Sequence, residues 1–194
     1  MIHAIKKFLG LSKFALVENV EIVHRSASGA VKKVFQPYYW AGMIIKHLGI
    51  QLPQIQFLFG YWSNSLRFQN LVTNAGFAGV ASRINGSGAE AAFVYLALGT
   101  GATAAAATDT TLQTEITDTG LARASATASR VTTTQTNDTA QLVYTWTATG
   151  AKAVTEAGVL NAASVGVLLA RQVFSAINTA NTDTIQVTYR VKAS

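Results

Sequence analysis

The chain contains no cysteine and little charge. The absence of Cys from its 194 residues excludes disulfides, a thiolate nucleophile and Cys-ligated zinc. Charged residues make up 12% of the sequence, about half the share of roughly 25% in an average globular domain. A lone monomer needs charge for solubility, so this scarcity favours a protein whose surface is partly covered by neighbours.

Long uninterrupted apolar runs are also missing. Lys13 ends the apolar stretch at the N-terminus below the ~7–15 residues of a signal-peptide core. Residues 38–62 are strongly apolar, but Lys46, His47 and Pro53 interrupt them, whereas a membrane-spanning helix needs ~20 nearly continuous apolar residues. We therefore expect neither a secretion signal nor a membrane span.

The net charge of +6 is concentrated near the start of the chain. Residues 1–68 hold eight basic and two acidic residues, whereas the remainder holds seven of each. Three interpretations stay open: a solvated basic face, a docking surface for an acidic partner, or a nucleic-acid contact. Nucleic acid is the least favoured because the basic residues are scattered and form no dense stripe.

The second half of the chain has the period of half-buried strands. In residues 184–192 the apolar positions Ile185, Val187, Tyr189 and Val191 alternate with polar ones. The absence of long helices between such segments favours a mainly β fold, an antiparallel, jelly-roll-like β-sandwich. Further strands are predicted over residues 93–98, 121–134, 141–149, 154–161 and 167–174.

The first half is aromatic, basic and less regular. Glycine in Ser26-Ala-Ser-Gly29 favours a β-hairpin between residues 19–25 and 30–35, because Gly29 can adopt a positive φ. We predict an attachment region over residues 1–68 and a sandwich domain with a leading helix over residues 69–194. Short helices are predicted over residues 2–17, 38–48 and 70–84, with a helical turn over 108–116.

The residues that could carry chemistry lack the context that chemistry needs. Gly99-Thr-Gly101-Ala-Thr-Ala104 fits a dinucleotide-binding fingerprint, but no long helix follows it, so we predict a plain turn. His3, His24 and His47 have no carboxylate or second histidine at metal-ligand spacing. We expect no catalytic residue, no cofactor and no metal, and therefore not an enzyme.

Two other features receive structural interpretations. Glu156 and Arg171 lie on strands predicted to pair, and an exposed salt bridge between them would contribute at most about 1 kcal/mol. Tyr144 and Trp146 could stack on sugars, but their alternation with Thr places them in the core more easily.

Five segments resemble structural proteins of tailed bacteriophages, the tail-fibre-like or virion proteins. They include Val154-Thr-Glu-Ala-Gly-Val-Leu-Asn-Ala162 and Leu168-Leu-Ala-Arg-Gln-Val-Phe174, and the others are residues 71–88, 95–101 and 108–116. The resemblance covers roughly residues 70–194. It implies a non-enzymatic virion component, favoured here as a tail fibre or adaptor, with capsid decoration as the alternative. A carbohydrate- or receptor-binding module is the second alternative.

The expected partners are other virion structural proteins and further copies of the chain, as a homotrimer assembled in the host cytoplasm. Low charge and small apolar faces suit subunit contacts. Aromatic and basic residues often carry interface energy. The predicted anchor residues are Lys6, Lys7, Phe8, Phe14, Trp40, Phe57, Phe59, Tyr61 and Trp62.

Overall fold

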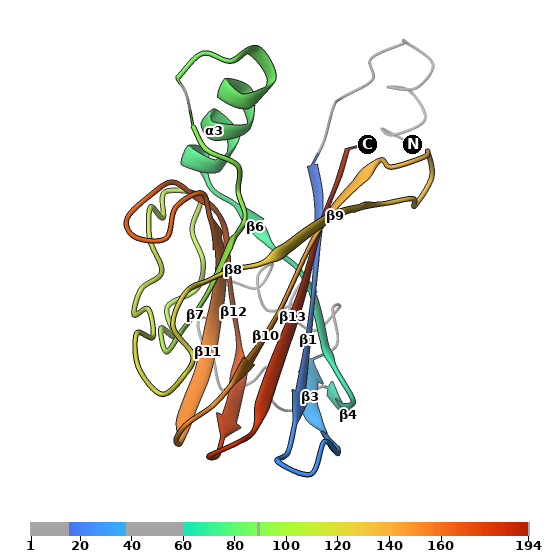
Figure 1. Ribbon diagram of the computed structural model, residues 1–194, viewed down its shortest axis with the longest axis vertical. Helices are drawn as coiled ribbons and strands as arrows, with labels where there is room; N and C mark the ends of the chain where they lie inside the picture. Colours follow the sequence, from blue (N-terminus) through green and yellow to red (C-terminus); the bar gives the residue numbers. More distant parts are fainter. Residues whose placement is uncertain (1–15, 38–59, 89, 194) are drawn as a thin grey trace, which may run out of the picture.

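Two antiparallel sheets form a β-sandwich, as the sequence predicts (Figure 1). The computed structural model describes residues 16–37, 60–88 and 90–193. In the six-stranded sheet the order is β2-β1-β13-β10-β9, and β5 also pairs with β1. Its strands are β1 (Leu16–Arg25), β2 (Val31–Lys32), β5 (Leu66–Gln69), β9 (Thr127–Val131), β10 (Thr139–Thr147) and β13 (Thr184–Ala193).

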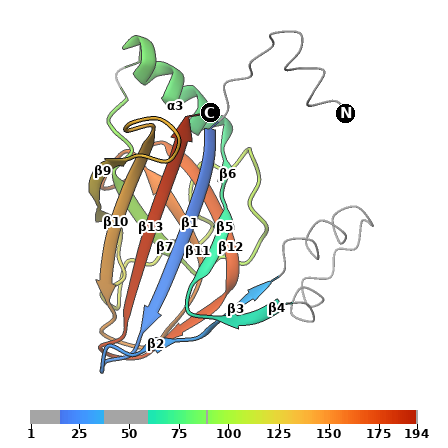
Figure 2. The same ribbon diagram turned by 90° about the vertical axis from the view of Figure 1, so that its right-hand side faces the viewer.

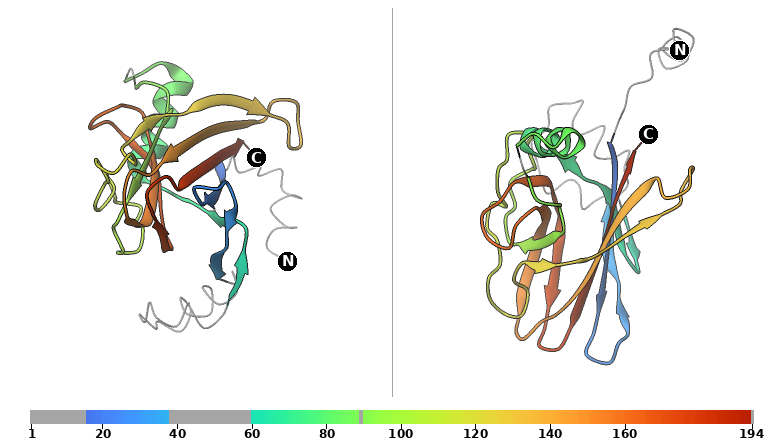
Figure 3. Two further views of the ribbon diagram at one scale, coloured as in Figure 1. Left: turned by 60° about the horizontal axis from the view of Figure 1, so that its bottom comes forward. Right: turned by 45° about the horizontal axis from the view of Figure 1, so that its top comes forward.

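The five-stranded sheet covers the inner face of the first, in the order β6-β12-β11-β7-β8. Its strands are β6 (Leu71–Val72), β7 (Tyr95–Gly99), β8 (Ala124–Ser125), β11 (Lys152–Leu160) and β12 (Leu168–Thr179). A separate two-stranded ribbon consists of β3 (Val34–Pro37) and β4 (Gly60–Ser63), and α3 (Asn74–Asn85) caps one end of the sandwich (Figure 3).

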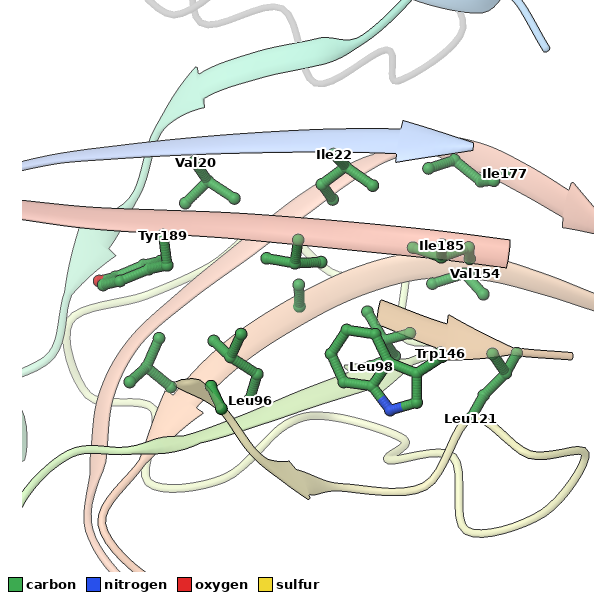
Figure 4. Packing of buried hydrophobic residues seen from close by; sticks show 14 of the residues in the cluster. Val20, Ile22, Leu96, Leu98, Leu121, Trp146, Val154, Ile177, Ile185 and Tyr189 are labelled. Carbon is green, nitrogen blue, oxygen red and sulfur yellow. The ribbon is translucent and has the colours of Figure 1, made fainter. Parts of the chain in front are cut away.

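Alternating apolar residues fill the space between the sheets. Ile185, Val187 and Tyr189 of β13 are at most 1% exposed, and Val20 and Ile22 lie beside them on β1 (Figure 4). Burying an apolar side chain of this size stabilises the fold by ~1.5–3 kcal/mol. The residues that alternate with these buried ones along β1 and β13 therefore point away from the core.

Helix α3 begins and ends where the sequence provides caps. The Thr73 hydroxyl oxygen accepts a hydrogen bond from the Gly76 N–H, and Gly86 adopts a left-handed conformation after the last turn. Gly76 and Gly79 face the sandwich, where a Cβ would overlap the Leu169 backbone and the Phe93 ring. The predicted helix over 70–84 is confirmed, but it starts later because residues 71–72 form β6.

Three predictions of the fold need correction. Residues 121–134, predicted as one strand, form β8 in the five-stranded sheet and β9 in the six-stranded sheet. Residues 108–116 form a loop and not a helical turn. The predicted boundary at residue 68 runs through the six-stranded sheet, because β1 pairs with β13 over its whole length and β5 pairs with β1. The sandwich thus includes residues assigned to the attachment region. Leu16 and Val17 belong to β1, whereas the remainder of the predicted helix over 2–17, and the helix over 38–48, lie outside the described residues.

Candidate partner-binding surface

The β3–β4 ribbon presents aromatic side chains outside the sandwich. Phe35 lies opposite Trp62, and their rings meet edge to face with centroids 6.0 Å apart. Tyr61 is 49% exposed and Trp62 is 66% exposed, although neighbouring strand residues point to opposite faces. Both faces of the ribbon are therefore accessible at these positions, and Figures 2 and 3 show the ribbon leaving the sandwich body.

Val34 and Gln36 help to hold the ribbon against the sandwich. Val34 is 7% exposed and packs in the core cluster. The Gln36 side chain donates to the Arg67 carbonyl oxygen at 2.9 Å and accepts from the Arg67 N–H at 2.6 Å. One amide side chain thus imitates the pairing of a strand with β5 and fixes where the aromatic residues are held.

The ribbon carries the two predicted anchor residues that the structure describes, Tyr61 and Trp62. The sequence-based prediction missed Phe35, Gln36 and Arg67, which support them. The hairpin pattern places Phe35 in a strand, but its contact with Trp62 crosses a long insertion and has no local signal. The other predicted anchors lie outside the described residues: Lys6, Lys7, Phe8, Phe14, Trp40, Phe57 and Phe59.

A buried carboxylate, Glu156, is the strongest candidate for chemistry elsewhere. It is 0% exposed, and its oxygens accept from the backbone N–H groups of Gly101 (2.9 Å), Gln113 (3.1 Å) and Thr114 (2.8 Å). Arg171, 2% exposed, donates Nε to the same carboxylate at 2.7 Å. The group is occupied by structural partners and inaccessible to a substrate, so its arrangement suits holding a loop in place.

Arg171 extends this cluster, whose members come from strands β11 and β12 and the loop over 100–123. Its Nη1 donates to Asp109 at 2.9 Å and its Nη2 to the Thr103 carbonyl oxygen at 3.1 Å.

Glu156 and Arg171 do pair as predicted, but the pair is buried and not exposed. The loop crosses the outer face of the five-stranded sheet and buries Leu112 there with Leu160 and Leu168.

The Gly99-Thr-Gly101 segment has a role in the same cluster. A Cβ at Gly99 or Gly101 would collide with the Glu156 carboxylate. These glycines therefore allow the backbone to approach a buried acid. The predicted turn is wrong, because Gly99 is the last residue of β7 and Thr100 and Gly101 are irregular.

A second buried cluster surrounds Asp183 in the turn between β12 and β13. Its Oδ2 accepts from Lys32 at 2.6 Å and from the Ala180 N–H at 2.8 Å, and it lies 3.0 Å from His24 Nε2. Burial would raise the pKa of Asp183, but these hydrogen bonds and the Lys32 charge lower it to about 2. The carboxylate thus ties the β1–β2 hairpin to the sandwich.

The described residues provide little else for a ligand. They contain no group of three or more His, Asp or Glu side chains placed to hold a metal ion. In this part of the chain no helix has the length and apolar character needed to cross a membrane. A cavity of about 10 Å³ beside Asn70, Leu96 and Trp146 could hold a water molecule but not an organic ligand.

Trp146 and Tyr144 lie where a core role requires them. Trp146 is 2% exposed and its indole N–H donates to the Ala122 carbonyl oxygen at 2.7 Å. The Tyr144 ring meets it edge to face, with centroids 4.7 Å apart. Neither presents an open ring face comparable with that of Trp62.

No protein-family model matches the chain, and comparisons with curated proteins and with solved structures likewise give no match. The candidate site therefore depends on its own geometry. Among the described residues the β3–β4 ribbon, with Trp62 at its exposed position and Gln36 as its tether, is the surface best suited to a partner.

Proposed function

We propose that this protein is a non-enzymatic structural component of a tailed-bacteriophage virion, associated with the tail as a fibre or adaptor. It docks on another virion protein through the β3–β4 ribbon and the other predicted anchors. The observation that carries the proposal is the exposed aromatic pair Tyr61 and Trp62 on a ribbon tethered to a rigid sandwich. Large aromatic side chains commonly provide the energetic centre of protein interfaces.

The charged clusters support a structural role. Glu156, Arg171 and Asp183 are buried and engaged in holding loops and turns. Such groups stabilise a scaffold rather than meet a substrate. The proposed class of assembly is the one that the resemblance of residues 70–194 to phage structural proteins implies, and capsid decoration is the alternative location within it.

Immunogold labelling of purified particles, with an antibody raised against residues 85–194, tests the class and the location together. Label confined to the tail or its tip supports a fibre or adaptor. Label along the head supports decoration instead. Absence of label on both intact and disrupted particles would reject a virion component.

A matched pair of variants tests the ribbon itself. Particles assembled with a tagged Y61S/W62S chain should contain little of it, whereas the F77S chain should be incorporated normally. Phe77 is a suitable control because it is 53% exposed on α3, away from the ribbon. Normal incorporation of the Y61S/W62S chain would reject the ribbon as the docking element.

The proposal includes a homotrimer, because a chain with only 12% charged residues suits burial of its surface between subunits. Sedimentation equilibrium at several concentrations measures this directly. A mass of about three times the 20.5 kDa chain is expected. A single 20.5 kDa species at every concentration would contradict it.

A further inference from the structure

The outer face of the six-stranded sheet carries an excess of positive charge. Because Ile22 and His24 of β1 and Val187 and Tyr189 of β13 are buried, the residues between them point outward. Register places four cations on this outward face and one described anion, Glu21. The cations are Arg25 on β1, Arg67 on β5, and Arg190 and Lys192 on β13.

Most of these cations have no carboxylate partner among the described residues. Arg67 pairs with Glu21 at 2.7 Å. Arg190 donates to the neutral Gln141 at 2.8 Å and Lys192 to the Thr134 hydroxyl at 2.7 Å, whereas no described acid lies within ion-pair distance of Arg25. Four cations against one carboxylate leave a net charge of +3 on the described outward positions, although Glu21 also attracts Arg190.

The five-stranded sheet shows the opposite pattern. The cations of this sheet and of the loop over 100–123 each have a carboxylate within 3.0 Å. Arg123 pairs with Glu115, Lys152 with Asp118, and Arg171 with both Asp109 and Glu156. The cations beside the five-stranded sheet are therefore paired, whereas Arg25, Arg190 and Lys192 have no described carboxylate within ion-pair distance.

Neutral hydrogen-bonding groups occupy most of the rest of this face. Gln141, Gln186, Thr145 and Thr188 lie at outward positions between the cations. The described outward positions contain no aromatic residue, and base recognition on a sheet face normally uses aromatic stacking. The absence of a stacking platform disfavours single-stranded bases, whereas guanidinium, amide and hydroxyl groups can all bind carboxylate side chains on a protein.

We propose that the outer face of the six-stranded sheet, around Arg25, Arg190 and Lys192, binds an acidic surface of a partner protein. The inference goes beyond the ribbon and does not depend on it. The two surfaces adjoin, because Gln36 of the ribbon holds the backbone of Arg67 at the edge of this sheet. A partner could contact both, with the ribbon giving apolar contacts and the sheet giving charge complementarity.

Binding of fluorescent poly-L-glutamate, followed by anisotropy at about 50 mM salt, tests the proposal, because low salt leaves surface charges weakly screened. The face variant R25Q/R190Q/K192Q should raise Kd about tenfold or more. The control variant K33Q/R83Q/R130Q removes the same amount of charge from exposed residues off this face. It should raise Kd by less than about threefold.

The conservative variant R25K/R190K keeps the charge and should retain most of the binding. Far-UV circular dichroism and unfolding temperature check that each variant is folded. Equal losses in the face and control variants would overturn the proposal, since attraction would then be a general effect of net charge. Double-stranded DNA binding more tightly than poly-L-glutamate, with the same dependence on the face residues, would overturn it in favour of nucleic acid.

Discussion

The outer faces of the two sheets are used in opposite ways. The five-stranded sheet is covered by the loop over 100–123, which Glu156 and Arg171 hold from beneath. The six-stranded sheet presents Arg25, Arg190 and Lys192 outward and carries the aromatic ribbon at its edge. Cations on the covered side are paired within the chain, whereas Arg25, Arg190 and Lys192 on the other side have no described carboxylate within ion-pair distance. Substitutions should therefore change stability on one side and binding on the other.

The largest expected effect comes from Arg171→Ala on the covered side. The substitution leaves Glu156 buried without its cation, and removing one partner of a buried pair costs about 3–5 kcal/mol. Urea unfolding followed by tryptophan fluorescence measures the free energy. The control is Arg67→Ala, whose guanidinium is 72% exposed beside Glu21 and should contribute less than about 1 kcal/mol. Equal losses of unfolding free energy in the two variants would contradict a difference between the two sheets in how much their charged residues stabilise the fold.

Asp183→Asn tests whether a buried carboxylate beside the six-stranded sheet also contributes to stability. The substitution weakens charged hydrogen bonds from Lys32 and the Ala180 N–H, at a cost of about 2 kcal/mol near neutral pH. Asp118→Asn is the control, because that side chain is 63% exposed, and it should leave stability nearly unchanged. A cost at Asp183 no greater than that at Asp118 would show that the buried cluster adds nothing.

The same variant has a defined pH dependence. The pKa of Asp183 is lowered from an ordinary 3.8 to about 2 in the folded protein. Its contribution to stability is therefore complete above the ordinary value and is lost as pH falls from about 4 to about 2. The stability difference between wild type and Asp183→Asn should shrink across this window. A constant difference between pH 5 and pH 2 would contradict the assignment.

Substitutions at two glycines test how tightly the backbone is packed on the covered side and on the open side of the molecule. Gly101→Ala places a methyl group against the Glu156 carboxylate and Gln113, and such overpacking costs about 2 kcal/mol. Gly29→Ala, in the turn after β1, meets no atom within 4 Å but must hold a φ of 81°, which costs about 1 kcal/mol. Thermal unfolding of both variants measures the difference. A smaller loss at Gly101 would mean that the loop yields easily to the added methyl.

These contrasts also mark what sequence could predict. Alternation in residues 184–192 predicts β13 because the period of two records which side faces the core. It cannot predict that a distant loop covers the outward side of β11. Sequence alone therefore predicts that Glu156 is an exposed partner of Arg171. The pairing of Leu16 with Ala193 likewise joins the two ends of the described chain. No local pattern contains that contact, and the proposed boundary at residue 68 divides a sheet as a result.

The ribbon shows a third kind of difficulty. Tyr61 and Trp62 are recognisable as candidate anchors from residue type, because aromatic residues are common at interfaces. Their exposure depends on β3 and β4 pairing across residues 38–59, and on Gln36 bonding to the Arg67 backbone. Composition thus identifies the candidates, whereas only the tertiary arrangement indicates which face of the molecule presents them.

The smallest stability effect is expected at Trp62, where binding should change most. Trp62→Ser removes a side chain that is 66% exposed and whose assigned ring contact is with Phe35. An exposed substitution of this kind should alter the free energy of unfolding by no more than about 0.5 kcal/mol. Incorporation into particles should nevertheless fall sharply, with Ile84→Ser on α3, 75% exposed, as the control. A loss of incorporation accompanied by a large loss of stability would place Trp62 among the structural residues. Substitutions on both sides of the molecule would then change stability, and the two sides would differ only in the size of that change.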